Sequence, residues 1–437
     1  AYLFTDAGPS AVIYHARFAS ALDRALDRAG LQAPLLLHVA DESGAALLPG
    51  ALDYEAALAA AAPDPLPVRP SPDDLHILYT GGTTGMPKGV LWRIADLLYG
   101  PLALRRRSGE HITDLDEAVG LAVAADRRVL VAPPLMHGSG TWTALGGWCG
   151  GATVVIPDRV DRLDAGDLLR TAAREGVTRM SLVGDAFARP LADVLGTGRH
   201  ELPALRQIIN SGAGISPGVK ERLTAALPGV RIVDAVGSSE TGFQVSRTGS
   251  ADRPFAPAPG AVVLSADRTR TLTPGEDETG WLAKAGPIPL GYLGDPGKTA
   301  ATFISVDGRR LVVAGDRARL LADGTIEVYG REATTINTGG EKVFAEEVET
   351  VLRDIAGVSD ALVVGRPSER WGQEIVAVVR LSGELTDDDL RAGCARHLAR
   401  YKVPKAFLRA DQDLRLPNGK ADYARARAIA TVSKELS

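Results

Sequence analysis

Short apolar runs alternate with glycine-rich turns and amphipathic stretches between Leu75 and Glu240. We expect buried strands at six of these runs, which lie at 76–79, 129–132, 152–156, 180–183, 207–209 and 231–233. A helix is expected over 219–227, because Ser216 can cap its first turn and Pro217 suits the first helical position. Alternating strands and helices of this kind predict a mainly parallel sheet that is covered by helices.

The pattern changes twice after Pro254. Residues 254–279 are rich in Pro, Gly and Thr, and short strands separated by Asp-Gly turns are expected afterwards at 280–283, 310–313 and 325–329. These features predict a compact β-subdomain. Beyond Arg331 we expect helices and strands at 345–355, 360–364, 374–379 and 387–399. Thr386 and Asp389 suit a cap for the last of these helices, and the segment predicts a small α+β domain.

Composition narrows the class of protein. The chain has 437 residues, of which 45 % are hydrophobic and 24 % charged, a balance typical of a soluble protein with two or three domains. Its 49 basic and 54 acidic residues are well mixed, so no nucleic-acid partner is expected. Cys149 and Cys394 are too few for a disulfide framework or a zinc site. We find neither a long apolar run nor the order of a signal peptide, so we expect a cytoplasmic protein without stable membrane insertion.

A loop rich in glycine and threonine follows the expected strand at 76–79. Residues 79–89 read YTGGTTGMPKG. Backbone N–H groups of such a loop can surround phosphate oxygens, the hydroxyls add donors, and Lys88 adds positive charge. It is not a Walker A loop, because Pro87 precedes the lysine and Gly89 stands where Ser or Thr is required. The loop therefore indicates phosphate binding, with a merely tight turn as the structural alternative.

Residues 79–89 resemble the phosphate loop of the adenylate-forming enzymes, which include acyl-CoA synthetases, nonribosomal adenylation domains and luciferases. The other motifs of this superfamily follow in order: NSGAG at 210–214, GSSETG at 237–242, VAGD at 313–316, YGR at 329–331, INTGGEKVFAEEVE at 336–349 and LPNGK at 416–420. The resemblance covers about 75–423. It implies an α/β protein with a large N-terminal domain at 1–332, which apparently lacks part of the family's N-terminal region, and a small mobile C-terminal domain at 333–437.

The resemblance also assigns roles to individual residues. Lys420 is the expected adenylation lysine, Glu240 the magnesium ligand, and Thr80 a third catalytic residue. One carboxylate with phosphate oxygens and waters is sufficient for Mg²⁺. ATP or AMP is expected to contact Thr80, Gly81, Gly82, Thr83, Thr84, Lys88, Gly212, Ala213, Gly214, Gly237, Ser238, Ser239, Asp316 and Arg331. The coenzyme A side is expected at Gly339, Gly340, Glu341 and Lys342.

The activity implied is that of an acyl-CoA synthetase that uses ATP, Mg²⁺ and coenzyme A. The expected acyl pocket contains His137, Gly138, Val183 and Asp185. A packed histidine with satisfied nitrogens is an equal alternative for His137, and structural packing is the plain alternative for Val183 and Asp185. No acid stands in the segment around His137 where an amino-acid-activating domain would hold an α-ammonium group, so an amino acid is disfavoured. The motifs look closest to bacterial enzymes that act on fatty acids and steroid side chains, which indicates a lipophilic acid. A homodimer is compatible with the resemblance.

Three positions depart from the superfamily pattern: Gly214 replaces a proline, Val236 an aromatic residue and Ala333 the usual hinge residue. An enzyme that performs one half-reaction, or a non-catalytic acyl- or nucleotide-binding protein, therefore stays an alternative. Retention of both Glu240 and Lys420 favours catalysis. A serine hydrolase is disfavoured, because its nucleophile elbow needs Gly-x-Ser-x-Gly and the residue that follows Ser239-Glu240 is threonine.

Overall fold

The chain divides into two units in the computed structural model. The N-terminal unit comprises Ala1–Ile94 with Leu290–Thr299, and the main unit comprises Ala95–Pro289 with Ala300–Ser437. Each unit has its own sheets. The structure describes residues 1–30, 34–80, 86–104, 106, 110, 112, 114–123, 125–198, 200–250, 252–338, 341–368, 372–416 and 419–435.

A small parallel sheet opens the N-terminal unit, with strand order β1 (Ala11–His15), β2 (Leu35–Val39), β3 (Leu52–Asp53). Leu22 packs with Tyr14 and Leu36 in an apolar cluster, which places a helix on one face of this sheet. The helices of this part are α1 (Tyr2–Ala7), η1 (Ala16–Phe18), α2 (Ala19–Ala29) and α3 (Tyr54–Ala60). The first residues of the chain thus form a strand–helix–strand unit of their own.

A second sheet of the N-terminal unit is antiparallel, with the order β15 (Gly291–Tyr292), β5 (Lys88–Arg93), β4 (Leu75–Thr80). We expected the strand at 76–79 to join the parallel series, and that prediction is wrong. β4 pairs with β5 in a hairpin in which Thr80 lies opposite Lys88. The physical reason is the short connection at 81–87, because parallel neighbours need a crossover of a dozen or more residues.

The main unit contains the expected parallel sheet. Its seven strands have the order β12-β11-β10-β9-β8-β6-β7. All neighbours from β7 to β10 are parallel, whereas β11 is antiparallel to both of its neighbours. The strands are β6 (Arg128–Val131), β7 (Thr153–Val155), β8 (Arg179–Leu182), β9 (Gln207–Ser211), β10 (Arg231–Ser238), β11 (Gly242–Thr248) and β12 (Ala256–Pro257).

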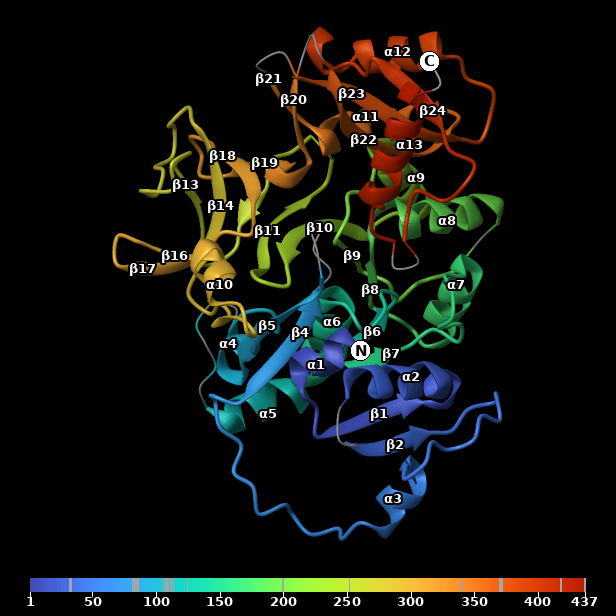
Figure 1. Cartoon of the computed structure of the whole chain (residues 1–437), viewed down its shortest axis with the longest axis vertical. Helices are drawn as coiled ribbons and strands as arrows, with labels where there is room; N and C mark the ends of the chain where they lie inside the picture. Colours follow the sequence, from blue (N-terminus) through green and yellow to red (C-terminus); the bar gives the residue numbers. More distant parts are fainter. Residues whose placement is uncertain are drawn as a thin grey trace. The chain divides into compact units, whose positions relative to one another are not determined.

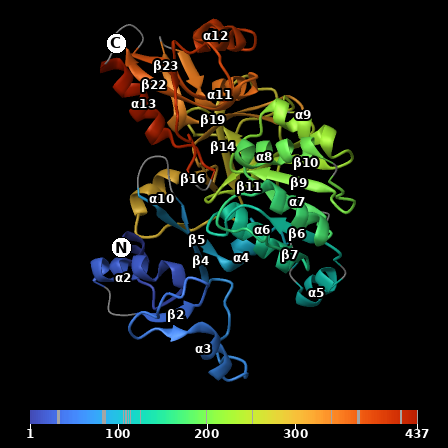
Figure 2. The same cartoon turned by 90° about the vertical axis from the view of Figure 1, so that its right-hand side faces the viewer.

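Helices cover both faces of this sheet because successive side chains of a strand point to opposite sides. Leu130 packs with α7 (Ala165–Arg174), α8 (Gly184–Thr197) and α9 (Pro217–Ala226) in the largest apolar cluster. Val129 and Val131 instead pack with Ala144 of α6 (Gly138–Cys149). Figure 2 shows α7, α8 and α9 beside the strands. Two shorter helices are α4 (Ile94–Tyr99) and α5 (Leu115–Val123).

Helix α9 begins with Pro217 after Ser216, as expected, but Ser216 does not cap it with its side chain. Two distant carboxylates meet this end of the helix instead. Asp185 accepts the Ser216 N–H at 2.8 Å, and Asp354 accepts the Gly218 N–H at 2.8 Å. Unpaired N–H groups and the positive end of the helix dipole favour such anions. The cap of α9 is therefore tertiary, whereas the sequence predicted a local one.

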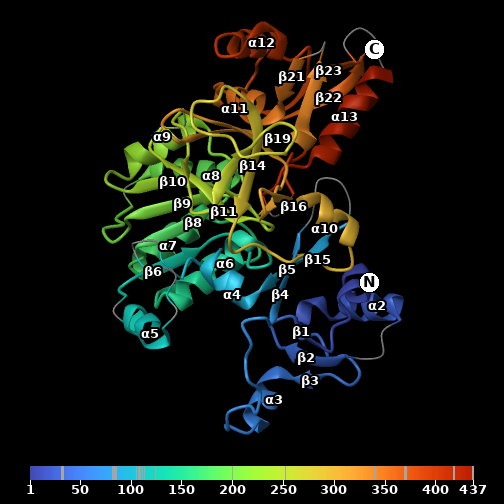
Figure 3. The same ribbon diagram turned by 90° about the vertical axis from the view of Figure 1, so that its left-hand side faces the viewer.

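The expected β-subdomain is an antiparallel sheet with the order β16-β17-β14-β18-β19 and with β13 paired to β14. Figure 3 shows β14, β19 and β16 of this part. Val245 of β11 packs with Leu282 and Ile326, which joins the subdomain to the edge of the parallel sheet. Its elements are β13 (Ala261–Leu264), β14 (Thr279–Ala285), α10 (Pro296–Thr302), β16 (Phe303–Val306), β17 (Arg309–Val312), β18 (Asp316–Leu320) and β19 (Ile326–Arg331).

The C-terminal segment is a five-stranded sheet with helices on both faces, seen at the top of Figure 1. Alternation along β22 decides the faces: Val363 packs with α11 and α12, whereas Leu362 and Val364 pack with α13. Thr386 and Asp389 form the expected capping box, but α12 ends four residues before the predicted 399. The elements are η2 (Glu332–Thr334), β20 (Thr335–Thr338), β21 (Glu341–Phe344), α11 (Ala345–Asp354), β22 (Val358–Ser368), β23 (Gly372–Leu381), α12 (Asp387–Ala395), η3 (Arg400–Lys402), β24 (Ala406–Arg409) and α13 (Tyr423–Glu435).

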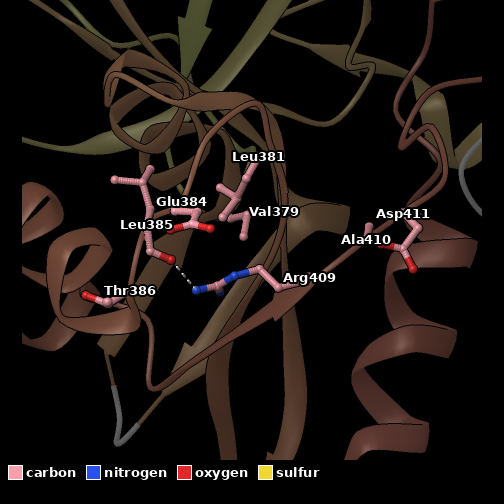
Figure 4. A pocket seen from close by; sticks show the side chains of 8 residues that line it. All are labelled: Val379, Leu381, Glu384, Leu385, Thr386, Arg409, Ala410 and Asp411. Atoms are coloured by element: carbon pink, nitrogen blue, oxygen red, sulfur yellow. Dashed lines mark hydrogen bonds between the residues drawn. The ribbon is translucent and has the colours of Figure 1, made fainter.

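A cavity of about 490 Å³ opens beside β24. Val379, Leu381 and Leu385 supply its apolar wall, and Figure 4 shows the Arg409 guanidinium directed at the Leu385 carbonyl. That hydrogen bond measures 3.0 Å. The cavity contains none of the residues that the sequence assigns to a site. Over the described part of the chain, no helix has both the length and the apolar character needed to cross a membrane.

A buried ion pair ties α9 to β10. Lys220 Nζ lies 2.7 Å from Asp234 Oδ2, and both side chains are less than a tenth exposed. Asp234 also accepts hydrogen bonds from Asn210 Nδ2 at 3.0 Å and Arg247 Nε at 3.1 Å. A buried carboxylate needs such partners, because removal from water is costly for an isolated charge.

Replacing Lys220 by methionine should leave the buried Asp234 carboxylate without its shortest partner. We expect Lys220→Met to lower the free energy of unfolding by about 2–4 kcal/mol in urea denaturation. Arg222→Met is the matched control on the same helix, because the Arg222–Asp193 pair is about half exposed. The control should cost less than about 1 kcal/mol. Equal losses in the two variants would contradict a stabilising role for the buried pair.

Candidate active site

The turn that carries Glu240 joins β10 to β11 and is held by its own hydroxyl groups. Thr241 Oγ1 accepts the Ser238 N–H at 2.9 Å and donates to the Gly242 carbonyl at 2.9 Å. The Glu240 N–H donates to Ser238 Oγ at 3.2 Å. The buried ammonium of Lys284 donates to the Thr241 carbonyl at 2.9 Å. These bonds fix the backbone from which the predicted residues Ser238, Ser239 and Glu240 project.

Gly237 is required by the close approach of the two strands at this turn. A Cβ at Gly237 would lie 2.0 Å from the Gly242 carbonyl oxygen, a distance that no side chain can adopt. Gly242 itself has a positive φ of 59°. Backbone geometry therefore explains why glycine stands at both ends of the GSSETG motif. The sequence analysis had assigned Gly237 only to nucleotide contact.

Asp316 and Arg331 lie directly opposite each other on the antiparallel strands β18 and β19. Arg331 Nε is 3.6 Å from Asp316 Oδ1. Asp316 is only 7 % exposed, so its carboxylate depends on this neighbour. The sequence grouped the two residues by resemblance, and the strand register supplies the physical reason that they meet.

Lys420 lies on a tight turn that follows β24. The Leu416 N–H donates to the Lys420 carbonyl at 2.8 Å, and the Gly419 N–H donates to the Leu416 carbonyl at 2.8 Å. Gly419 has a φ of 80°, and a Cβ there would touch Phe187 at 3.4 Å. The turn therefore lies against the beginning of α8, which brings Lys420 to the main sheet.

Four charged side chains from these three segments lie within electrostatic range of one another. Burial raises the pKa of Asp316, with Arg331 opposing the rise and Glu240 adding to it. Burial lowers the pKa of Lys420, and Arg331 lowers it further while Glu240 acts in the opposite sense. Asp316 is the main cause of the raised pKa of Arg331. The fold thus brings together the residues predicted for ribose, metal and adenylation.

The NSGAG turn at 210–214 packs against the beginning of α8. Buried Asn210 accepts the Gly184 N–H at 2.7 Å and donates to the Ala213 carbonyl at 3.0 Å. Gly212 has a φ of 78°, and a Cβ there would lie 3.5 Å from Val183. A Cβ at Gly214 would meet nothing within 4 Å, so the usual proline would have room. The predicted residues Gly212, Ala213, Gly214 and Val183 are therefore neighbours.

His137 and Gly138 stand at the beginning of α6. Burial lowers the pKa of the His137 imidazole, and the Lys420 ammonium adds to this effect. His137 Nε2 is buried and has no hydrogen-bond partner among the described residues. The proximity of Lys420 and the unpaired ring nitrogen place His137 at the edge of the charged group.

Asp185 was predicted to line the acyl pocket, but its carboxylate has several protein partners. Beyond the Ser216 N–H, it lies 3.2 Å from Arg189 Nη2 and 3.7 Å from Arg353 Nε. Arg353 belongs to α11, so Asp185 links α8 to the C-terminal segment. This set of contacts is compatible with a structural role, which the sequence had named as the plain alternative.

The N-terminal unit carries the ends of the predicted phosphate loop. Thr80 and Lys88 face each other across the β4–β5 hairpin, and Lys88 Nζ lies 5.4 Å from the centre of the Tyr292 ring. Gly81, Gly82, Thr83, Thr84, Gly339 and Gly340 lie outside the described residues. Glu341 and Lys342 form part of β21, opposite Thr338 and Asn337 of β20.

The oxygen donors around Glu240 fit magnesium rather than zinc. Among the described residues, no three His, Cys, Asp or Glu side chains are grouped so that they could hold a metal ion. Glu240 supplies one carboxylate, and the hydroxyls of Ser238 and Thr241 lie in the same turn. Mg²⁺ commonly combines one or two carboxylates with substrate phosphates and water, so this set is chemically adequate.

Three residues near the site were missed by the sequence analysis. Lys284 supports the Glu240 turn, Asp354 caps α9, and Glu346 contacts the segment after Arg331. A lysine within an apolar strand, at 279–285, was the only sequence signal for Lys284. Val236 packs with the β-subdomain core, which accounts for an aliphatic residue at this position.

Comparison with known proteins identifies the family of the chain. The family described as AMP-binding enzyme matches residues 1–289, and the AMP-binding enzyme C-terminal domain matches 347–420. The medium-chain acyl-CoA ligase Mig of Mycobacterium avium is 46 % identical over 98 % of this chain and 79 % of its own length. The 3-oxocholest-4-en-26-oate–CoA ligase of Rhodococcus rhodochrous is 39 % identical over 86 % of this chain and 70 % of its own length.

A crystal structure of ATP-bound MatB from Rhodopseudomonas palustris has the same fold. It superposes with a TM-score of 0.78 at 23 % identity and covers 98 % of this chain and 80 % of that one. The expected α/β fold class is thereby confirmed. Because the family match covers well over half of the chain, and relatives above 30 % identity match most of its length, the chain belongs to the family of AMP-binding enzymes.

Proposed function

We propose that this chain is an ATP-dependent acyl-CoA ligase that converts a lipophilic carboxylic acid into an acyl-adenylate and then into an acyl-CoA thioester. Family membership and the similarity to two acyl-CoA ligases support the activity. The observation that carries the proposal is the position of Lys420. This lysine of the C-terminal segment lies within electrostatic range of both Glu240 and Arg331.

In the first half-reaction, a carboxylate oxygen of the acid attacks the α-phosphorus of ATP. A bond forms between that oxygen and phosphorus, and pyrophosphate leaves with the electron pair of the broken bond. The acid is ionised at neutral pH, so no general base is needed. The barrier is largely the approach of two anions, which a positioned cation lowers. We assign this role to Lys420, with Asp316 accepting the ribose hydroxyls and Arg331 beside it.

Magnesium would be held by Glu240 together with phosphate oxygens. The ion would supply positive charge to the phosphates. The hydroxyl bonds of Thr241 and Ser238 keep the backbone of Glu240 in place for this purpose. For the phosphates themselves we propose Thr80 and Lys88 with the glycines and threonines of the loop at 81–84.

In the second half-reaction, the thiol of coenzyme A attacks the acyl carbonyl, the thiol proton is lost, and AMP leaves. We propose that residues 339–342 serve this step and that the C-terminal domain, 333–437, moves about a hinge near Ala333. A neutral thiol does not need the lysine that two anions require. Hinge motions of this kind commonly separate steps with different requirements.

The acyl group is proposed to lie near His137, Gly138 and Val183. Val183 adjoins the turn at 212–214, which places an apolar side chain beside the predicted nucleotide residues. The two relatives are named for a medium-chain acyl group and a steroid acid, and both groups are lipophilic. We therefore propose an acid with a large apolar body for this chain.

ATP–pyrophosphate exchange over a series of acids of increasing length tests the substrate class. Affinity should rise by roughly 0.8 kcal/mol, about fourfold, for each buried methylene until the pocket is filled. The same series with coenzyme A should yield thioesters. Preference for acetate or for an amino acid over every larger apolar acid would contradict the proposal.

Replacing Lys420 by alanine should separate the two half-reactions. Adenylation from acid and ATP should fall on the order of 100- to 1000-fold, because a cation at the reacting phosphate is lost. Thioester formation from supplied acyl-adenylate and coenzyme A should be nearly unchanged. Lys405→Ala is the control, because the side chain of Lys405 is exposed. Equal losses in both half-reactions of Lys420→Ala would mean a structural role for this lysine.

Glu240→Gln keeps the shape of the side chain and removes its charge. We expect a higher magnesium requirement and a large loss of acyl-adenylate formation, measured across a magnesium titration. Glu221→Gln, at an exposed position on α9, controls for the loss of one negative charge. If Glu240→Gln adenylates like the unchanged protein at limiting magnesium, Glu240 is not the ligand.

A further inference from the structure

Glu346, in the first turn of α11, contacts the short segment that follows β19. Its Oε1 lies 2.8 Å from Thr334 Oγ1. Thr334 Oγ1 also lies 2.8 Å from the Arg331 carbonyl oxygen, and the hydroxyl of Thr335 reaches the same carbonyl at 3.3 Å. The contact therefore joins the helix of the C-terminal segment to the residues around the proposed hinge at Ala333.

The hydroxyl of Thr334 has one proton and two acceptors within reach. It donates to Glu346 Oε1, and the Arg331 carbonyl also has the Thr335 hydroxyl as a donor. The bond to Glu346 forms whether the glutamate is neutral or ionised, so the surroundings of its second oxygen decide which form is favoured.

The second oxygen of Glu346 favours the neutral carboxyl group. Oε2 is buried and has no hydrogen-bond partner among the described residues. It is packed on Gly330, where a Cβ would lie 2.6 Å away. An ionised oxygen in such a place would be costly, since burial disfavours the charged form of an unpaired carboxylate.

Charged groups face Glu346 from each element packed against it. On α11 itself, Glu349 is 3 % exposed and fully paired, with the Val363 N–H and the Tyr423 hydroxyl each at 2.9 Å and Arg353 at 3.3 Å. It is thus a fixed negative charge one turn away. From β19, Arg331 attracts Glu346 but is shared with Asp316. From α13, Tyr423 interacts with both glutamates.

We propose that Glu346 is a positioning residue that holds α11 against residues 330–334 only while it carries a proton. Loss of the proton then favours release of the C-terminal segment from the arrangement in which Lys420 reaches the site. The consequence for the two half-reactions rests on the function proposed above. The proton-dependent contact between α11 and residues 330–334 does not depend on that function.

The pKa of the carboxyl agrees with this geometry and sets the pH range. Burial, and secondarily the charge of Glu349, raises the pKa of Glu346 from 4.5 to about 7, against the opposing effect of the Thr334 hydroxyl and of the backbone N–H groups of Glu346 and Arg331. In the released state the carboxyl is hydrated and regains its ordinary pKa. The state in which α11 lies against residues 330–334, called the held state, therefore binds the proton more tightly. Its free-energy advantage over the released state is greatest at low pH. As pH rises toward 7 the advantage falls, by up to about tenfold per pH unit, and it levels off above that value.

The fraction of molecules in the held state can be measured without substrate, from the distance between spin labels on α8 and α12. Asp193 and Asp388 are suitable label sites, with side chains 58 % and 93 % exposed. Cys149→Ala removes the partly buried native thiol, and Cys394 is buried. The fraction with the short, held distance should fall severalfold between about pH 5 and pH 7 and change little above.

Glu346→Gln keeps a neutral group whose amide oxygen can accept from Thr334, so the fraction with the short distance should stay constant over this range. Glu347→Gln is the matched control, because Glu347 is the next residue and pairs with Lys402 at 2.7 Å near the surface. It should keep the pH response of the unchanged protein. A pH response retained in Glu346→Gln, or release of that variant at every pH, would overturn the proposal.

Thr334→Val provides a second test that does not alter the glutamate. It removes the oxygen that Glu346 contacts and preserves the shape of a side chain that is 7 % exposed. The held fraction should then be lower than in the unchanged protein at about pH 5, where the carboxyl is neutral. An unchanged held fraction would contradict the role of this contact. Failure of ATP–pyrophosphate exchange with every acid would remove the proposed function and leave these distances valid.

Discussion

The contact between buried Asp316 and partly exposed Arg331 is the interaction on which the candidate site depends. The Asp316 carboxylate is not stable alone in the interior, and the register of β18 with β19 brings Arg331 opposite it. Arg331 also marks the point where the β-subdomain ends and the C-terminal segment begins. Its side chain therefore belongs to the candidate site, while its carbonyl oxygen lies 2.8 Å from the Thr334 hydroxyl, so that the candidate site and the C-terminal segment share one residue.

Among the described residues, the C-terminal segment meets the parallel sheet through polar contacts rather than through a common apolar core. Asp354 accepts an N–H at the beginning of α9, and Arg353 approaches Asp185 on α8. The apolar clusters of the segment consist of its own strands and helices. The Asp354 contact is exposed and can be exchanged for water, whereas the Arg353–Asp185 pair is buried, so separating it would expose two charges to water.

Lys420 and Glu346 illustrate two uses of burial in this segment. Burial lowers the pKa of Lys420, but Glu240 favours its charged form. Glu346 lies beside a glutamate that already has its own partners, so burial favours its neutral form. Lys420 brings a positive charge to the candidate site, whereas the neutral form of Glu346 places no charge beside residues 330–334. Both effects depend on the C-terminal segment lying against the strands of the main unit.

The sequence by itself determined the fold class, most strands of the parallel sheet and the candidate motifs, because these depend on local periodicity and on short spacings of glycine, hydroxyl and charged residues. It identified Glu240, Asp316, Arg331 and Lys420 as site candidates, and the structure brings these four together. It placed the strand at 76–79 in the wrong sheet and gave α9 a local cap. Only the tertiary structure decided the partners of Asp185, Asp354 and Glu346, because those carboxyls meet groups that lie far away in the chain or across a turn, where burial rather than sequence neighbours sets their chemistry.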